Sequence, residues 1–270
     1  MLFVALATVS TKGAETRRWI RSNAISPDGT KIAFVYHGDI FVVSSNGGVA
    51  KQITSNPAYD TSPAWSKDGK FIAFSSDRLG GFDVYLTSCN GGTPKRLTTH
   101  SAGEMVETFL PDGRILYRSY YMPTAEDGVF PGQFTQVYSV DTAASRPKKF
   151  SELFMSNISV NAKGEVLYQD RKGMEDTWRK HHTSPVTRDI WLTNLDPKKR
   201  TYKKLSDYAG ECRNPQWAPD GKSYYYLEES SGSLNVWKRN IDGSGKKQIT
   251  FFKKNPVRYL SVSETGRMSF

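Results

Sequence analysis

Long apolar runs, cysteine and histidine are all scarce in this sequence of 270 residues. Its two cysteines, Cys89 and Cys212, are too few for a disulfide framework, and no CxxC motif is present. No segment approaches the roughly 20 apolar residues that a membrane-spanning helix needs. Four histidines provide little material for a metal centre. We therefore expect no membrane insertion, no metal and no cofactor.

Clustered charge is also missing, although the chain is basic with a net charge of +10. Lysine and arginine are scattered over the expected strand ends and turns, and they form neither a long run nor a basic helix. This distribution is typical of a solvated basic surface. We do not expect nucleic acid as a partner.

Recognisable catalytic motifs are absent from the sequence as well. It contains no G-x-S-x-G nucleophile elbow and no glycine-rich phosphate loop. His37 and His100 are isolated, and neighbouring acids such as Glu175 and Asp176 are typical of a solvated loop. Because no nucleophile has an activating neighbour, we predict no catalytic residue in this segment.

The N-terminus carries a short apolar run at residues 2–9, followed by small and polar residues. This run resembles the apolar region of a signal peptide, although the usual positive charges before it are missing. We predict that residues 1–16 are a signal-peptide remnant, which implies a periplasmic or secreted protein. The alternative is a buried first strand.

A hairpin motif occurs six times along the chain. The stretch AISPDGTKIAF at 24–34 returns as AWSKDGKFIAF at 64–74, and four weaker copies follow. Internal repetition at such a period is typical of propellers and solenoids. Each copy contains one glycine, and successive glycines lie 40 to 57 residues apart: Gly29, Gly69, Gly113, Gly164, Gly221 and Gly266.

These glycines are predicted to be structural turn residues. In Ser-Pro-Asp-Gly the proline fixes φ at the first corner and aspartate suits the second. The glycine then adopts the positive φ that closes a type I turn with a bulge. Aromatic and β-branched residues flank the turns and favour strands. Each copy therefore predicts a strand–turn–strand hairpin.

Two further strand signals follow each of the first five hairpins. One is a polar, β-branched, aromatic triplet, such as DIF at 39–41 and DIW at 189–191. The other ends in a hydroxyl residue, such as QIT at 52–54. The unit is therefore four short strands, which is the content of a propeller blade.

We accordingly predict an all-β fold, an incomplete six-bladed β-propeller over residues 17–270. It consists of five complete four-stranded blades plus the first hairpin of a sixth. The half blade would leave an unpaired edge at Arg267–Phe270 and an open gap in the ring, so association into a homo-oligomer is left open. The blades are expected at about 19–55, 60–99, 105–151, 156–206, 212–250 and 257–270.

The longest loops join the second and third strands of blades 3 and 4, at 118–135 and 169–188. Both lie on one face of the predicted ring, and long loops on a rigid scaffold often carry function. We therefore expect binding residues there. The candidates are Arg171, Trp178, Arg179, His181, His182 and Arg188 in blade 4, with Tyr120 and Tyr121 in blade 3.

The chemistry of these loops leaves several interpretations open. The arginines could bind a carboxylate or a peptide C-terminus, because guanidinium groups pair with such anions bidentately. A metal site is disfavoured, since His181 and His182 are adjacent and no third ligand is near. Tyr120 and Tyr121 could grip a peptide or a sugar. Both loops could instead be structural, covering blade edges.

The repeats resemble the WSPDG…IAF blades of TolB-like, PD40-type (WD40-like) propellers, a motif that several families share. Two longer stretches, from RSNAISPDG at residue 21 to SSDR at 78 and EDTWRKHHTSPVTRDIW at 175–191, carry a more specific likeness. They resemble the N-terminal region of secreted bacterial homologues of the tricorn protease.

That resemblance implies a six-bladed propeller followed by a second propeller and a serine-protease domain, with the propellers controlling peptide passage to the protease site. No residue here corresponds to a catalytic position of the family, so we expect a segment truncated before the protease domain. Its implied partners are peptides or the remaining domains of a tricorn-like peptidase. The alternatives are a stand-alone TolB-like protein-interaction module of the cell envelope, and a propeller lyase acting on sugars.

Overall fold

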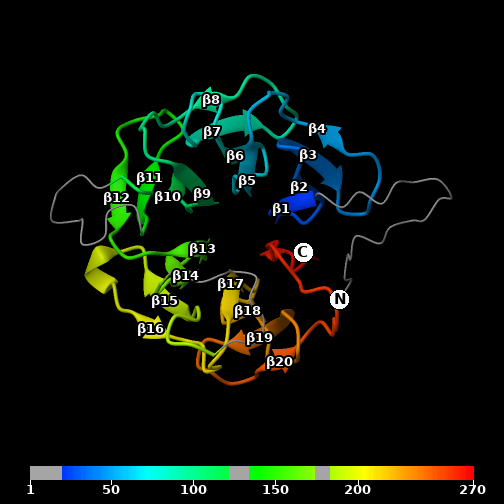
Figure 1. The fold of residues 1–270 in the computed structure, drawn as a ribbon, viewed down its shortest axis with the longest axis vertical. Helices are drawn as coiled ribbons and strands as arrows, with labels where there is room; N and C mark the ends of the chain where they lie inside the picture. Colours follow the sequence, from blue (N-terminus) through cyan, green and yellow to red (C-terminus); the bar gives the residue numbers. More distant parts are fainter. Residues whose placement is uncertain (1–19, 122–133, 174–182) are drawn as a thin grey trace.

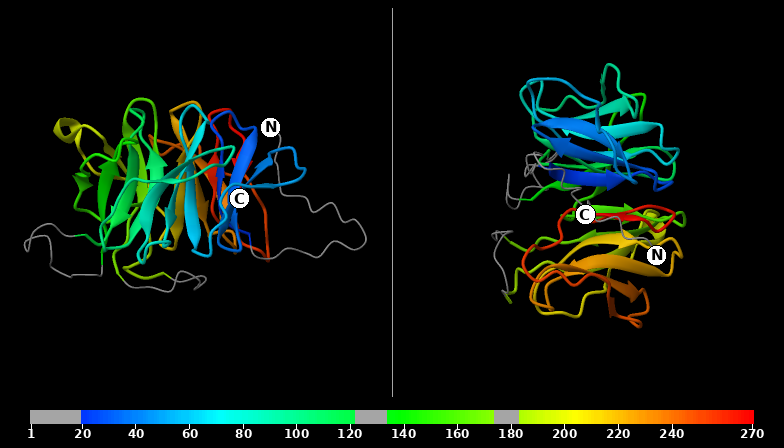
Figure 2. Two further views of the ribbon diagram at one scale, coloured as in Figure 1. Left: turned by 90° about the horizontal axis from the view of Figure 1, so that it is seen from above. Right: turned by 90° about the vertical axis from the view of Figure 1, so that its right-hand side faces the viewer.

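Hairpins form around all six turn glycines in the computed structural model, which describes residues 20–121, 134–173 and 183–270. The described residues form a ring of small antiparallel sheets around a central axis (Figure 1). Seen from the side, the strands of each sheet cross the thickness of the ring (Figure 2). The connections between strands therefore gather on the two faces of the ring.

Five of the sheets have four strands each, ordered along the chain from the centre of the ring to its rim. Blade 1 consists of β1 (Ile20–Ile25), β2 (Lys31–Tyr36), β3 (Asp39–Ser44) and β4 (Lys51–Gln52). Blade 2 consists of β5 (Asp60–Trp65), β6 (Phe71–Ser76), β7 (Asp83–Ser88) and β8 (Lys95–Arg96). Blade 3 consists of β9 (Glu104–Phe109), β10 (Ile115–Ser119), β11 (Gln136–Val140) and β12 (Lys148–Ser151).

The second half of the ring repeats this arrangement. Blade 4 consists of β13 (Ser156–Val160), β14 (Glu165–Gln169), β15 (Ile190–Asn194) and β16 (Lys203–Lys204), with the short 3₁₀ helix η2 (Pro197–Lys199) before β16. Blade 5 consists of β17 (Cys212–Trp217), β18 (Ser223–Glu228), β19 (Asn235–Asn240) and β20 (Lys247–Gln248). A two-stranded sheet of β21 (Ser261–Val262) and β22 (Met268–Ser269) follows.

This architecture confirms the predicted fold class, an all-β propeller with five four-stranded blades and a hairpin. In the described part of the chain, no helix has the length and apolar character needed to cross a membrane.

The hairpin turns have one geometry throughout. The backbone N–H of each turn glycine donates to the carbonyl three residues earlier, as from Gly29 to Ser26 at 2.8 Å. All six glycines have positive φ, between 60° for Gly221 and 85° for Gly113. In blade 1 the Asp28 carboxylate accepts hydrogen bonds from the Ser26 hydroxyl and the Thr30 N–H. These bonds lower the pKa of Asp28 and fix the turn.

The hydroxyl residue that follows the fourth strand of blades 1, 2, 4 and 5 bonds to the beginning of the third strand of the same blade. The Thr54 hydroxyl accepts a hydrogen bond from the Ile40 N–H at 2.9 Å, and Thr98 does the same for Val84 at 2.8 Å. In blade 4 the Ser206 hydroxyl bonds to Asp189, which begins the third-strand signature. The two sequence signals therefore hold the short outer strand on its blade.

Apolar side chains fill the spaces between neighbouring blades. Five core clusters each combine residues of two consecutive blades, from the first pair to the fifth and sixth. Two tryptophans four residues before a turn glycine also bond across these spaces. Trp65 Nε1 donates to the Ala24 carbonyl at 2.9 Å, and Trp217 Nε1 donates to the Glu165 carbonyl at 3.2 Å.

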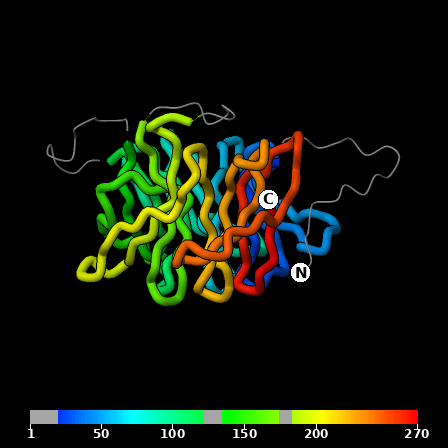
Figure 3. The backbone as a smooth tube through the Cα atoms, turned by 90° about the horizontal axis from the view of Figure 1, so that it is seen from below, coloured from blue at the N-terminus to red at the C-terminus, as the bar shows by residue number. Residues whose placement is uncertain are grey.

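The C-terminal hairpin closes the inner ring between β17 and β1 (Figure 3). The Ile25 N–H donates to Ser261 Oγ at 3.1 Å, and Ser269 Oγ donates to Asn23 Oδ1 at 2.6 Å. Arg267 adds a bond to Ser45 Oγ at 2.7 Å. The ring is therefore continuous at its inner strands, because two strands suffice to reach both neighbours. The expected gap is confined to the rim.

Candidate functional site

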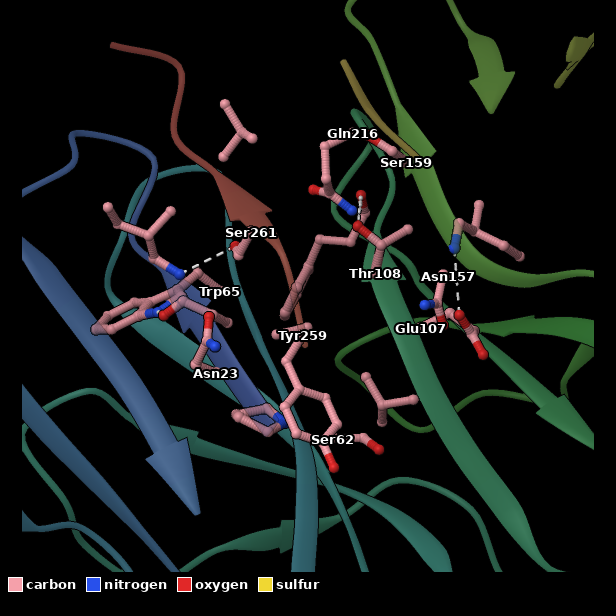
Figure 4. Close-up of a pocket in the computed structure, with 18 of the residues that line it drawn as sticks. Asn23, Ser62, Trp65, Glu107, Thr108, Asn157, Ser159, Gln216, Tyr259 and Ser261 are labelled. Carbon is pink, nitrogen blue, oxygen red and sulfur yellow. Dashed lines mark hydrogen bonds between the residues drawn. The ribbon is translucent and has the colours of Figure 1, made fainter. Parts of the chain in front are cut away.

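The inner strands of all six units surround a central channel of about 260 Å³. Figure 4 shows polar side chains from different blades pointing into it, among them Asn23, Ser62, Thr108, Asn157 and Gln216. These residues come from β1, β5, β9, β13 and β17, so each blade contributes through the same strand. In this channel the sixfold repeat brings together side chains from equivalent positions of different blades.

A bulge in each inner strand shapes the channel wall. The pairing of the inner strand with its neighbour shifts register in all five complete blades, for example between Arg21 and Asn23. A bulge leaves one residue unpaired and bends the strand. In five units a non-glycine residue seven positions before the turn glycine has positive φ, between 41° and 55°: Ser22, Ser62, Asn157, Asn214 and Tyr259.

Backbone groups near the bulges are satisfied by side chains of the adjacent blade. The Val106 N–H donates to Ser75 Oγ at 2.8 Å, and the Ile158 N–H donates to Glu107 Oε2 at 3.2 Å. Asn214 Nδ2 donates to the Leu260 carbonyl at 2.8 Å. Because buried backbone groups need such partners, the channel wall is held by bonds that run from blade to blade.

Two ion pairs lie along the channel. Glu107 is nearly buried and pairs with Arg118, a neighbour on the same blade. Lys67 and Glu264 pair at 3.6 Å, both with exposed side chains. Each positive charge has a carboxylate beside it, so these pairs give the channel no marked charge of one sign.

The candidate residues of the blade 4 loop are only partly within the described chain. Trp178, Arg179, His181 and His182 lie outside it. Arg188 is buried and its guanidinium bonds to Glu211 Oε1 at 3.0 Å. Glu211 also accepts from Arg213 Nε at 2.9 Å. Burial lowers the pKa of Arg188, and the Glu211 carboxylate opposes that shift.

Arg171 and Tyr121 contact different partners. Arg171 stacks over the ring of Phe154, 5.7 Å from its centroid. Tyr120 is exposed, whereas Tyr121 packs on His100 with 4.2 Å between ring centroids. The Tyr121 carbonyl accepts from the Tyr138 hydroxyl at 2.8 Å. The binding role of all four described candidates stays a prediction, and the structure gives three of them packing or hydrogen-bonding partners.

The channel residues were not singled out from the sequence, although a signal for them exists. Serine or asparagine occupies the position seven residues before the turn glycine at Ser22, Ser62, Asn157 and Asn214. Asparagine adopts left-handed backbone more readily than most residues. The repeat thus carries a third signal, for the bulge, besides its apolar and glycine positions.

Two buried carboxyl groups, Asp83 and Glu104, interact at the beginnings of β7 and β9. Arg96 pairs with Asp83 at 2.7 Å. Burial raises the pKa of Glu104 to about 7, and the nearby charge of Asp83 adds to the shift. Among the described residues, no cluster of three or more His, Cys, Asp or Glu is arranged to hold a metal ion.

Several known proteins share parts of this sequence or its fold. The Tol-Pal system protein TolB of Nitratidesulfovibrio vulgaris is 34% identical over 60 residues, which is 22% of this chain and 13% of that protein. The solved structure of TolB from Acinetobacter baumannii matches with a TM-score of 0.65 and 18% identity. That match covers 90% of this chain and 56% of the other.

The crystal structure of the tricorn protease matches with a TM-score of 0.71 and 21% identity, over 91% of this chain. The match covers only 24% of the protease chain, so the present chain corresponds to a minor part of that protein. At such identities the structural matches establish the fold. Residues 17–267, nearly the whole chain, match the family described as the tricorn protease N-terminal β-propeller domain, and the chain belongs to that family.

Proposed function

We propose that this propeller is a non-catalytic segment of a tricorn-like serine peptidase that gates or scaffolds the passage of peptides to a protease domain. The observation that carries the proposal is the channel of about 260 Å³ inside a continuous inner ring. Its volume is below the roughly 300–1,000 Å³ of drug-sized ligand pockets. A folded protein is therefore excluded, whereas an extended peptide segment is suited to it.

The lining chemistry supports a peptide rather than a charged small molecule. Side-chain amides and hydroxyls such as Asn157, Gln216 and Thr108 can both donate and accept hydrogen bonds. Peptide backbone presents the same two kinds of group in every residue. A channel that offers such groups from six directions can hold backbone with little dependence on sequence.

Blocking the channel tests the proposal. Thr108→Trp places a large ring in the channel, and Thr201→Trp places the same ring at an exposed position outside it. With a fluorescein-labelled peptide digest of casein as the probe, fluorescence anisotropy should report binding to the native chain and to Thr201→Trp. Binding to Thr108→Trp should be at least about tenfold weaker, a loss near 1.4 kcal/mol. Equal binding by both variants would contradict the channel as the site.

The absence of catalysis is tested separately. The purified chain, incubated with a fluorescence-quenched casein substrate, should produce no increase in fluorescence. Hydrolysis that disappears when a residue of this chain is substituted would overturn the non-catalytic assignment. A serine-protease inhibitor added to the same reaction identifies hydrolysis by a contaminating enzyme.

A second candidate is a TolB-like protein-interaction module of the cell envelope, favoured by the sequence match to TolB. This proposal and the first share a periplasmic or secreted location, which the apolar run at residues 2–9 supports. Fusing residues 1–30 to alkaline phosphatase should give phosphatase activity in intact cells. An inactive but expressed fusion would contradict export.

A further inference from the structure

Tyr259 differs from the residues at the equivalent position of the other units. That position lies seven residues before the turn glycine and lines the channel in every unit. The other units carry a serine, an asparagine or a valine there: Ser22, Ser62, Val106, Asn157 and Asn214. The repeat therefore brings five smaller side chains and one aromatic ring to the same level of the channel.

The ring of Tyr259 extends into the channel. Figure 4 shows it pointing from the sixth unit toward the side of the channel that Ser62 lines. Two other aromatic residues along the described wall, Trp65 and Phe109, are buried between blades, whereas Tyr259 is 36% exposed. The ring thus occupies space in the channel that the equivalent residues of the other units leave open.

The backbone at Tyr259 is strained and its surroundings are fixed. Its φ is 55°, a left-handed value that a bulky side chain adopts only at a cost in free energy. The Leu260 carbonyl accepts from Asn214 Nδ2 at 2.8 Å, and Ser261 Oγ accepts from the Ile25 N–H at 3.1 Å. These bonds to both neighbouring blades fix the position from which the ring extends.

Stability does not account for a tyrosine at this position. Among the described residues, the Tyr259 side chain makes no hydrogen bond, ring contact or cation–π contact. Asparagine adopts left-handed backbone more readily than tyrosine, and Asn157 and Asn214 do so at the equivalent positions of blades 4 and 5. A strained residue of this kind in a channel wall points to a role in function.

We propose that Tyr259 determines the size of the side chains that the channel accepts. This inference rests on the proposed binding of peptides in the channel, and it adds a substrate class to that proposal. Side chains as small as those of glycine, alanine and serine fit beside the ring, whereas aromatic side chains overlap it. Because close-packed protein yields little to added volume, the channel favours peptides with small side chains.

Two labelled peptides test the proposal. One has six serines and the other six tyrosines between terminal lysines, and each carries fluorescein on a flexible linker. Both peptides present hydroxyl groups, so they differ in the ring, and every register places the same side chain beside Tyr259. In fluorescence anisotropy the native chain should bind the serine peptide at least about tenfold more tightly. Tyr259→Asn should reduce that preference at least about fivefold.

Three further variants serve as controls. Tyr259→Phe keeps the ring and should keep the preference, which separates the size of the ring from its hydroxyl group. Tyr259→Ser introduces the residue that blades 1 and 2 carry at this position, and it replaces Tyr259→Asn if that variant fails to fold. Tyr202→Asn makes the same substitution at an exposed position outside the channel and should behave like the native chain.

The outcomes separate this inference from the channel proposal. An unchanged preference in Tyr259→Asn, or a native chain that favours the tyrosine peptide, would show that the ring does not limit side-chain size. The channel proposal would survive either result. A native chain that binds the casein digest but neither defined peptide would also refute the size limit. If it binds none of the three, the channel proposal fails and this inference fails with it.

Discussion

At the scale of the residue, stability depends on side chains that serve two blades at once. Trp65 fills the space between blades 1 and 2 and also donates to the Ala24 carbonyl at 2.9 Å. Glu107 pairs with Arg118 and accepts the Ile158 N–H of the next blade. Such residues join one blade to its neighbour. Their loss should therefore destabilise the interfaces between blades more than the individual sheets.

Replacing the tryptophan bond isolates one of these contacts. Trp65→Phe keeps an aromatic ring but removes the donor, which leaves the Ala24 carbonyl without that bond. We expect the free energy of unfolding to fall by about 1 kcal/mol, the typical net contribution of one hydrogen bond. Urea denaturation followed by circular dichroism measures it. Tyr202→Phe, at an exposed position, is the control; equal losses in both variants would refute the bond's contribution.

The buried carboxyl group of Glu104 predicts a dependence of stability on pH. Its pKa is about 7 in the folded chain against an ordinary 4.5, so folding favours the protonated form. The resulting stabilisation is complete below pH 4.5 and is lost as the pH rises through 7. A shift of this size corresponds to about 3 kcal/mol.

Glu104→Gln keeps a neutral side chain and should remove this dependence. Urea midpoints measured from pH 4.5 to 8 should fall for the native chain relative to the variant. Parallel curves over that range would show that Glu104 ionises normally.

At the scale of the element, the hairpins and the four-strand unit were predictable because the glycine turn is a local signal. Side chains within a few residues of Gly69 suffice to form this turn. One of their interactions is the bond from the Ser66 hydroxyl to Asp68 at 2.6 Å. The bulges were not predicted, because their local signal is only a serine or asparagine seven residues before the glycine, and the partners of their backbone groups come from other blades. Val106, for example, depends on Ser75. The channel site was missed for the same reason.

Two turn glycines provide a matched comparison of backbone and contact effects. Gly29 and Gly69 have φ of 74° and 68°, so alanine is strained at both. A Cβ at Gly69 meets nothing within 4 Å, whereas one at Gly29 lies 2.5 Å from Thr265 Oγ1 of the sixth unit.

Gly69→Ala should therefore cost about 1–2 kcal/mol, and Gly29→Ala should cost more. Adding Thr265→Ala should restore the Gly29 variant toward the Gly69 value. Thermal denaturation monitored by circular dichroism ranks the three proteins. Equal losses for Gly29→Ala and Gly69→Ala would mean that the turn of blade 1 moves freely away from Thr265.

At the scale of the whole molecule, the ring is closed by the smallest of its sheets. A propeller gains stability when every blade has two neighbours, and here the hairpin of β21 and β22 contacts both β17 and β1. Among the described residues, the apolar cluster of Ile25, Ile32 and Val43 belongs to blade 1 alone, and no apolar cluster combines residues of blades 6 and 1. Blades 6 and 1 should therefore separate more easily than any other pair.

Removing the two closing serine hydroxyls tests this weakest junction. Ser261 accepts from the Ile25 N–H at 3.1 Å and Ser269 donates to Asn23 at 2.6 Å, so Ser261→Ala with Ser269→Ala loses both bonds. The loss of each bond should lower the free energy of unfolding by about 1 kcal/mol. Hydrogen exchange read by mass spectrometry should accelerate in peptides spanning 20–25 and 257–270 and stay unchanged in blades 2 to 4. Acceleration spread evenly over all blades would instead mean that the ring opens as one cooperative unit.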